Sequence, residues 1–181
     1  MYIGKKVLIF LTVIFVIAVG CLASYIGMHG FSARDKPMAI EAYFARRARL
    51  LSIPAGAKSM KNPIPANPLN IAEGRDHFAD HCAVCHANNG SGKTLMGSNL
   101  YPPTPDMRTN ETQGLSDGQL LYIIKNGVRF TGMPGWGGDD EENFKLVLFI
   151  RRLPQLSADE LELMKEVNQL DPEEASEGMN H

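Results

Sequence analysis

Hydrophobic and polar positions divide the chain into a long apolar run, a short amphipathic stretch, and a longer part with apolar residues at helical spacing. Residues 7–28 contain no charged side chain. At the helical rise they would extend over about 33 Å, which is enough to cross a hydrocarbon core about 30 Å thick. This run predicts a transmembrane helix with lipid around residues 7–28.

Lysines at the N-terminal end predict the orientation of this helix. Lys5 and Lys6 precede the apolar run, and cytoplasmic ends of membrane helices are enriched in Lys and Arg. We therefore expect residues 1–28 to anchor the chain in a bacterial cytoplasmic membrane, with the rest on the periplasmic or extracytoplasmic side. Two alternatives stay open, namely a signal peptide that is cleaved and a lipoprotein acylated at Cys21.

Residues 29–68 have the composition of a connector. In residues 37–51 a proline suits the first helical turn, and Ile40 and Phe44 share one side with arginines interspersed. We expect a short basic amphipathic helix that lies on the membrane or docks a partner, or else a solvated spacer. The prolines that follow Ser52 favour an extended, semi-stiff strap.

Apolar periodicity predicts helices in residues 69–156, which we expect to form one domain. The expected helices are 71–82 with Asn70 as its cap, 117–126 after Ser116, and a last core helix between Asn143 and Pro154. In residues 157–181, Ser157 and Glu160 form a capping-box pattern. This pattern predicts a further helix to about Leu170, packed on the core or on a partner. Beyond Asp171 the acidic tail predicts disorder.

The distribution of charge excludes one class of function. Residues 1–68 carry nine Lys and Arg against two Asp and Glu, a balance of +7, whereas residues 69–181 carry nine against eighteen, a balance of −9. The basic part suits the neighbourhood of anionic lipid. The acidic part argues against nucleic-acid binding, which needs a basic surface.

The segment Cys82-Ala-Val-Cys85-His86 carries the most specific chemistry. C-x-x-C-H is the attachment pattern of c-type haem. Cys82 and Cys85 would form thioether bonds to one haem c, and His86 would bind the iron. A redox dithiol would need a βαβ context, and zinc would need more ligands. We interpret His77 and His81, which precede the motif, as surface residues.

Gly74 and Phe78 precede this motif as a Gly-x-x-x-Phe pattern. Together with an aromatic residue on the last core helix, the pattern resembles the class I cytochrome c family over residues 69–154. The resemblance implies an all-α fold in which about three to five helices wrap the haem, here with an N-terminal transmembrane helix and a C-terminal helical extension. It also implies that Gly74 permits a close crossing by the last core helix, whose aromatic is Phe149 or Phe144.

The resemblance further implies a methionine as the second iron ligand. Met133 lies 47 residues after His86 in Thr131-Gly-Met-Pro-Gly, which resembles the Gly-Met-Pro loop of the family. Glycine and proline favour a rigid, nonhelical loop at this point. Met96 and Met107 are the alternatives.

Other residues are expected to contact the haem from loops. The resemblance implies a loop proline, Pro102 or Pro103, whose carbonyl accepts a hydrogen bond from the iron-bound imidazole. Trp136, Tyr101 and Arg108 are candidates to bind the haem propionates, because donors stabilise carboxylates near an apolar pocket. For Trp136 plain packing is the alternative, and for Arg108 a solvated position.

These features predict an electron-transfer protein and not an enzyme, with no catalytic residues. Iron held by His86 and Met133 would cycle between Fe(II) and Fe(III) at a comparatively high potential. The protein would be a membrane-tethered carrier or a cytochrome c subunit of a respiratory complex, with redox proteins or that complex as its partners. The alternative is a haem enzyme or gas sensor with an open or labile sixth coordination site.

Overall fold

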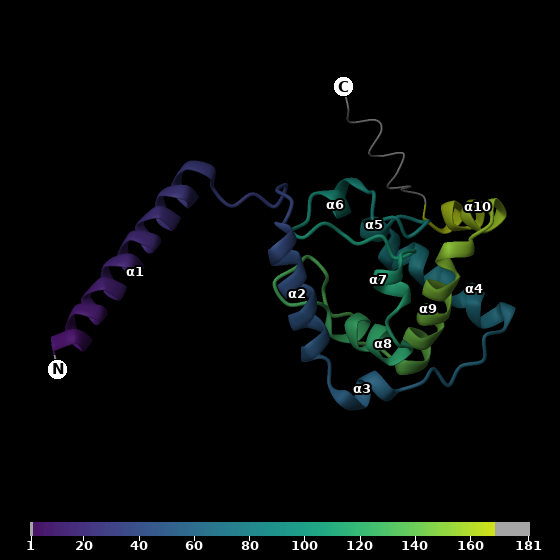
Figure 1. Ribbon diagram of the computed structural model, residues 1–181. Coiled ribbons are helices and arrows are strands. Elements are labelled where there is room, and N and C mark those ends of the chain that lie inside the picture. Colours follow the sequence, from purple (N-terminus) through teal and green to yellow (C-terminus); the bar gives the residue numbers. More distant parts are fainter. Residues whose placement is uncertain (1, 169–181) are drawn as a thin grey trace, which may run out of the picture. The chain divides into compact units, whose positions relative to one another are not determined.

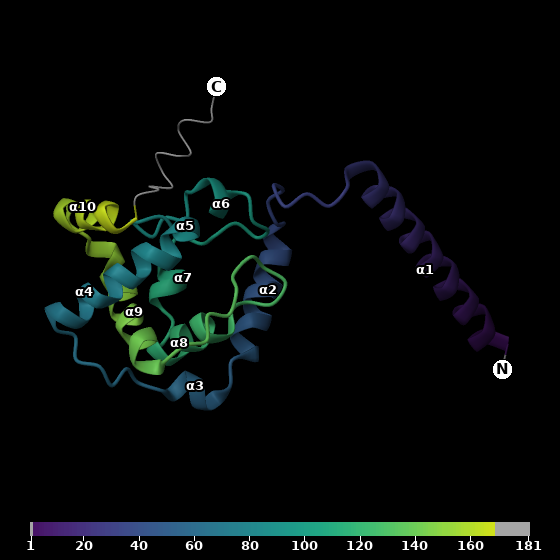
Figure 2. The same ribbon diagram turned by 180° about the vertical axis from the view of Figure 1, so that it is seen from behind.

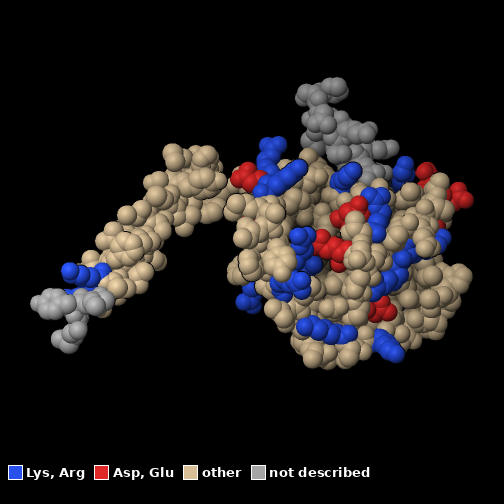
Figure 3. Space-filling model, viewed as in Figure 1, with Lys and Arg blue, Asp and Glu red and all other residues tan. Residues whose placement is uncertain are grey.

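Uncharged residues build the first helix, α1 (Tyr2–His29), in a computed structural model that describes residues 2–168. The apolar side chains of this helix are exposed along its length, as Val7 and Met28 are at its two ends. Figure 3 shows charge at the N-terminal end of α1 and none along the rest of the helix. Residues Gly4–His29 are long and apolar enough to cross a membrane, so α1 is a candidate membrane anchor, as predicted.

The chain divides into two compact units, of which the first is Met1–Asp35 and the second begins at Lys36. Within the described part of the second unit every regular element is helical, as the sequence predicts (Figures 1 and 2). The elements are α2 (Ala39–Ser52), α3 (Ala55–Ser59), α4 (Pro68–His77), the π-helical turn η1 (Phe78–Cys82), α5 (Ala83–His86), α6 (Leu95–Ser98), α7 (Asn110–Gln113), α8 (Asp117–Asn126), α9 (Asp140–Arg152), the 3-10 turn η2 (Leu153–Gln155) and α10 (Ala158–Val167).

Local capping signals set several of these boundaries. Ser116 and Ser157 each form the capping box that the sequence predicts, at the starts of α8 and α10. The predicted start of α4 was wrong. Asn67, not Asn70, is the cap, and its side chain accepts a hydrogen bond from the backbone N–H of Asn70, while Pro68 occupies the first turn. Proline suits this position because its missing N–H is not needed there.

Helix α4 crosses α9 at one side of the second unit (Figures 1 and 2), and these two helices make the most extensive contact between described elements. A Cβ atom at Gly74 would lie 2.6 Å from the carbonyl carbon of Lys145, so only glycine permits this approach. Below the crossing, Phe78 and Phe149 are fully buried with their ring centroids 5.2 Å apart. The predicted role of Gly74 is therefore confirmed, and Phe149 is the aromatic residue of α9 that meets Phe78.

Residues 36–68, most of the segment that the sequence predicts as a connector, belong to the second compact unit and pack on its helices. Ile53 is buried, and the Ser116 hydroxyl donates a hydrogen bond to the carbonyl of Lys58 at 3.0 Å. Asn62 donates its side-chain amide to the carbonyl of Phe144 in α9 at 2.9 Å. At the other end of the chain Met164 of α10 is buried in the core, so this helix packs as predicted. The predicted acidic tail after Asp171 lies outside the described residues.

Candidate haem site

A cavity of about 350 Å³ opens between α2, the α4–α5 region, α8 and α9. In both ribbon views α2 lies at one side of the second unit and the α4–α9 pair at the other (Figures 1 and 2). Most of the cavity lining is apolar, as expected of a site that binds a large flat ligand. Residues that line it from different elements include Phe78, Leu100, Met107, Leu120, Ile123, Ile124, Val128, Leu146 and Ile150.

The helix that bears the Cys-x-x-Cys-His motif changes its winding just before the motif. Residues 78–82 form a π-helical turn in which the backbone N–H of Ala83 bonds to the carbonyl of Phe78. One extra residue is accommodated in such a turn, which rotates the side chains that follow it. Cys82, Cys85 and His86 all line the cavity from this stretch.

Hydrogen bonds of Thr94 and the close packing of Gly97 hold the backbone of the Cys-x-x-Cys-His motif. The buried Thr94 hydroxyl donates to the carbonyl of Val84 at 2.9 Å and accepts from the backbone N–H of Gly97 at 2.8 Å. Gly97 packs so closely on the carbonyl of Cys85 that a side chain there would collide with it. The short helix α6 therefore fixes the backbone between the two cysteines.

Burial makes the ionisable groups of the motif neutral. Desolvation, with the neighbouring Cys85 as a smaller cause, raises the pKa of the Cys82 thiol to about 12, and burial also raises the pKa of Cys85. Burial lowers the pKa of His86 to about 4, so its imidazole is uncharged at neutral pH. The Nδ1 atom of His86 is buried without a hydrogen-bond partner.

These properties fit haem c. Two thiols and a neutral imidazole line one apolar cavity, and a neutral ring offers the lone pair that iron binding requires. The Nδ1 atom of His86 is a buried polar atom without a hydrogen-bond partner in the protein. Buried polar atoms are normally hydrogen-bonded, so contacts within the protein do not explain why this imidazole is buried. Cys82 and Cys85 would hold the haem covalently, and His86 would bind its iron.

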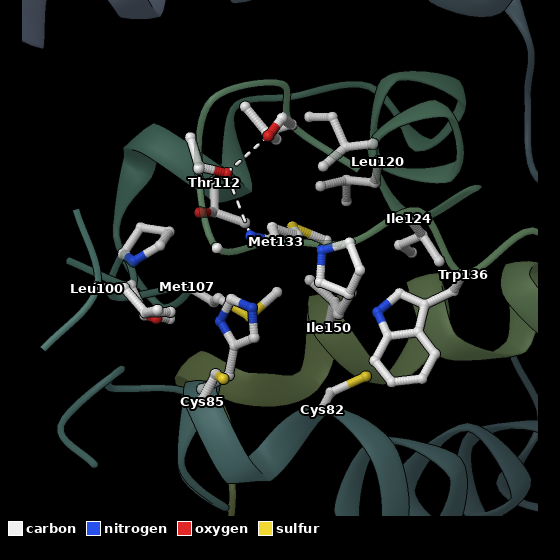
Figure 4. A pocket seen from close by; sticks show the side chains of 18 of the residues that line it. Cys82, Cys85, Leu100, Met107, Thr112, Leu120, Ile124, Met133, Trp136 and Ile150 are labelled. Atoms are coloured by element: carbon white, nitrogen blue, oxygen red, sulfur yellow. Dashed lines mark hydrogen bonds between the residues drawn. The ribbon is translucent and has the colours of Figure 1, made fainter. Parts of the chain in front are cut away.

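Met133 lies on the opposite wall of the cavity from Cys82 and Cys85 (Figure 4). Its loop is closed by two hydrogen bonds, from the N–H of Val128 to the carbonyl of Met133 at 3.1 Å and from the N–H of Met133 to the hydroxyl of Thr131 at 3.2 Å. Gly127 has φ +66°, and a Cβ there would lie 2.6 Å from the carbonyl oxygen of Met133. A positive φ and this close approach both require glycine.

The alternative methionines differ from Met133 in their surroundings. Met107 also lines the cavity, but it is 8% exposed and belongs to the hydrophobic core. Met96 also lines the cavity and is 53% exposed.

Of the other residues expected to contact the haem, some line the cavity and some do not. Pro102 and Pro103 line the cavity, but neither carbonyl accepts a hydrogen bond from His86. Trp136 also lines it. Tyr101 and Arg108 are not among the described residues that line this cavity, because their side chains bind elsewhere. The Tyr101 hydroxyl donates to Glu41 at 2.7 Å, and the guanidinium of Arg108 forks onto the Asp106 carboxylate at 2.7 and 2.9 Å.

Three ionisable residues that line the cavity were not anticipated. Arg49 lines the cavity from α2, and Glu111 lines it from α7. No pattern in the sequence around either residue predicts that its side chain reaches the cavity. His81, interpreted from sequence as a surface residue, is exposed yet lines the cavity, and its ring meets Trp136 edge-on at 5.7 Å. Its spacing one residue before Cys82 is the signal that could have placed it at the rim.

Comparison with known proteins adds two findings. Residues 69–150 match the model of a family described as cytochrome c oxidase, cbb3-type, subunit III. Over 41 residues the chain is 39% identical to a thiosulfate dehydrogenase of Stutzerimonas stutzeri (strain A1501). That match covers 23% of this chain and 13% of the relative, so the chain spans only a small part of that protein.

Proposed function

We propose that the c-type cytochrome domain of residues 69–150 is an electron carrier whose iron is held between His86 and Met133. The domain carries haem c, attached through Cys82 and Cys85. When bound, the haem supplies an iron that takes up or releases one electron. One observation carries the proposal: Met133 lines the same apolar cavity as His86, and it lies on the opposite wall from Cys82 and Cys85 (Figure 4).

The surrounding residues support a carrier because they hold both proposed ligands rigidly. The hydroxyl of Thr94 secures the motif, and Gly127 with Thr131 secures the Met133 loop. Ligands that do not move keep reorganisation small when an electron is transferred. The apolar lining excludes water, which favours a neutral imidazole and, with methionine ligation, a comparatively high potential.

Exposed apolar side chains at the cavity mouth support contact with a redox partner. Val84, Met96 and Trp136 line the cavity and are 46%, 53% and 46% exposed. Phe130, on the same loop as Met133, is 93% exposed and has φ +62°, an unusual conformation for a bulky residue. An apolar rim of this kind is typical of a surface that binds another protein. We infer a redox protein, or a larger respiratory complex, as the partner.

The membrane position belongs to the same proposal. Helix α1 supports a single-pass anchor, and Lys5 and Lys6 before it support a haem domain on the periplasmic side of a bacterial cytoplasmic membrane. Alkaline washing should leave the chain in the membrane, whereas detergent should release it. Protease added to spheroplasts should digest the cytochrome domain, and digestion only after lysis would contradict this orientation.

Spectroscopy of the haem-loaded full chain in mild detergent tests the ligands. The ferric protein should show a sulfur-to-iron charge-transfer band that Met133→Ala abolishes and that Met38→Ala, a change at an exposed methionine outside the cavity, leaves intact. The potential should fall in Met133→Ala, because thioether sulfur stabilises ferrous iron.

Other outcomes of the same experiment contradict parts of the proposal. Loss of the band in Met96→Ala, with the band retained in Met133→Ala, would make Met96 the ligand. A parent protein that has no such band and binds carbon monoxide rapidly when reduced would contradict a carrier. That result would support a haem enzyme or gas sensor with an open site.

A further inference from the structure

Arg49 is an arginine of α2 whose side chain lines the haem cavity. It lies outside residues 69–150, the part that matches the cytochrome family model. Its Nε atom is buried and has no hydrogen-bond partner. Because a buried donor of a charged group is costly to leave without an acceptor, this N–H calls for a ligand atom that the protein itself does not supply.

Glu111, the acidic neighbour of Arg49, does not satisfy that donor. Its carboxylate lies 3.0 Å from the guanidinium of Arg46, one turn earlier on α2, and 3.8 Å from the Nη2 atom of Arg49. Arg46 therefore makes the closer ion pair. Arg49 keeps donors for a second carboxylate, and its side chain is 25% exposed against 48% for Arg46.

The chemistry of the cavity indicates what that carboxylate is. Among the described residues that line it, Arg49 is the one with a fixed positive charge. Haem has two propionate groups, which are carboxylates on an otherwise apolar macrocycle. A guanidinium binds a carboxylate through a planar fork and is the side chain best suited to do so where water is scarce.

Tyr101 and Arg108, which the sequence offers for this role, bind other groups. The Tyr101 hydroxyl binds Glu41 on α2, and Arg108 binds Asp106. We infer that Arg49, contributed by the helix before the cytochrome domain, binds a haem propionate and thereby acts as a positioning residue that tunes the haem. This inference rests on the proposed function, because it needs haem in this cavity.

The test compares Arg49→Gln with Arg46→Gln in the haem-loaded full chain at pH 8, where propionates are ionised. Both variants lose one positive charge of α2 near Glu111, but only Arg49 lines the cavity. Without a cation beside the propionate, addition of an electron to the haem is less favourable. Arg49→Gln should therefore shift the one-electron equilibrium toward the ferric form about tenfold, or about 59 mV. Arg46→Gln should shift it less than about twofold, or about 18 mV.

Equal potentials in the parent, Arg49→Gln and Arg46→Gln would overturn the inference. The sulfur-to-iron band of the parent reports on the proposed function separately, so the two ideas fail by different observations. Nitrogen-15 NMR of the parent decides the matter if Arg49→Gln does not retain haem. The Nε–H of Arg49, assigned with Arg49→Lys, should exchange with water more slowly than that of Arg46, and equal exchange would overturn the inference.

Discussion

Replacement of Gly74 by alanine tests the helix crossing that supports the haem motif. Considered as an isolated helix, α4 should gain about 1 kcal/mol from this change, because alanine is a better helix former than glycine. In the fold, however, the new methyl group would lie 2.6 Å from the carbonyl carbon of Lys145 and 3.1 Å from the backbone nitrogen of Leu146. These are backbone atoms of α9, so no side-chain rotation can relieve the contact.

The helices must therefore separate. Ordinary contact begins at 3.4 Å, so the crossing has to open by at least about 0.8 Å, the difference between 3.4 and 2.6 Å, and the carbonyl oxygen of Lys145 is nearer still. Gaps of this size forfeit a quarter to a half of each dispersion contact, and the buried pair of Phe78 and Phe149 lies directly at the interface. Overpacking costs about 1–3 kcal/mol. With the propensity gain subtracted from the upper value, we expect a net destabilisation of about 2 kcal/mol.

Guanidinium unfolding of the haem-loaded chain in mild detergent measures this change. Trp136 is the single tryptophan and lines the haem cavity, so its fluorescence reports on loss of the site. Gly56→Ala is the matched control, since Gly56 lies in helix α3 and a Cβ there meets nothing within 4 Å. The control should be neutral or slightly stabilising. If Gly74→Ala were as stable as Gly56→Ala, the crossing would not be as close as described, and our reasoning would be refuted.

Three further substitutions test local interactions by the same unfolding assay. Ser116→Ala removes a capping box and a hydrogen bond to Lys58, and should cost about 1–2 kcal/mol; an unchanged midpoint would contradict this. Thr94→Val leaves the N–H of Gly97 without its acceptor, should cost about 1–3 kcal/mol and should broaden the haem spectrum. Glu160→Gln keeps the capping box but loses the charge that Arg152 stabilises. Hydrogen bonding by Arg152 lowers the pKa of Glu160 below its ordinary 4.5. The variant should therefore lose about 0.5 kcal/mol at pH 7. That difference should close as the pH falls from about 4.5 through the lower folded pKa, and a gap independent of pH would argue against the ion pair.

Local signals in the sequence were sufficient for much of the fold. The serine caps at Ser116 and Ser157 act on N–H groups three residues away, so the sequence nearby contains both partners. Gly74 was informative for another reason. Glycine inside a helix needs a cause, and a close crossing supplied it. The misplaced cap of α4 involved two asparagines three residues apart, Asn67 and Asn70, between which only the position of Pro68 decides.

Residues whose roles depend on distant partners could not be placed in this way. Tyr101 and Arg108 have the right chemistry for propionates, but their acceptors are Glu41, 60 residues away, and Asp106. An amphipathic pattern in α2 predicts a helix, yet it does not tell which side meets the body of the protein. The side that does so bears Arg49, while apolar Phe44 is 63% exposed. Hydrophobicity alone would have predicted the reverse.

Helices α2 and α3 belong to the compact unit that begins at Lys36, although they precede residues 69–150, the part of the chain that matches a family model. Two contacts join these helices and the segment after them to residues 69–150. The side-chain amide of Asn62 donates a hydrogen bond to the carbonyl of Phe144. A Cβ atom at Gly118 would collide with the backbone of Ala57. A chimaera that transplanted residues 69–150 alone would lose both contacts and the side chain of Arg49 from the lining of the haem cavity. Grafts of this domain onto a different N-terminal helix should therefore begin at Lys36, where the compact unit begins.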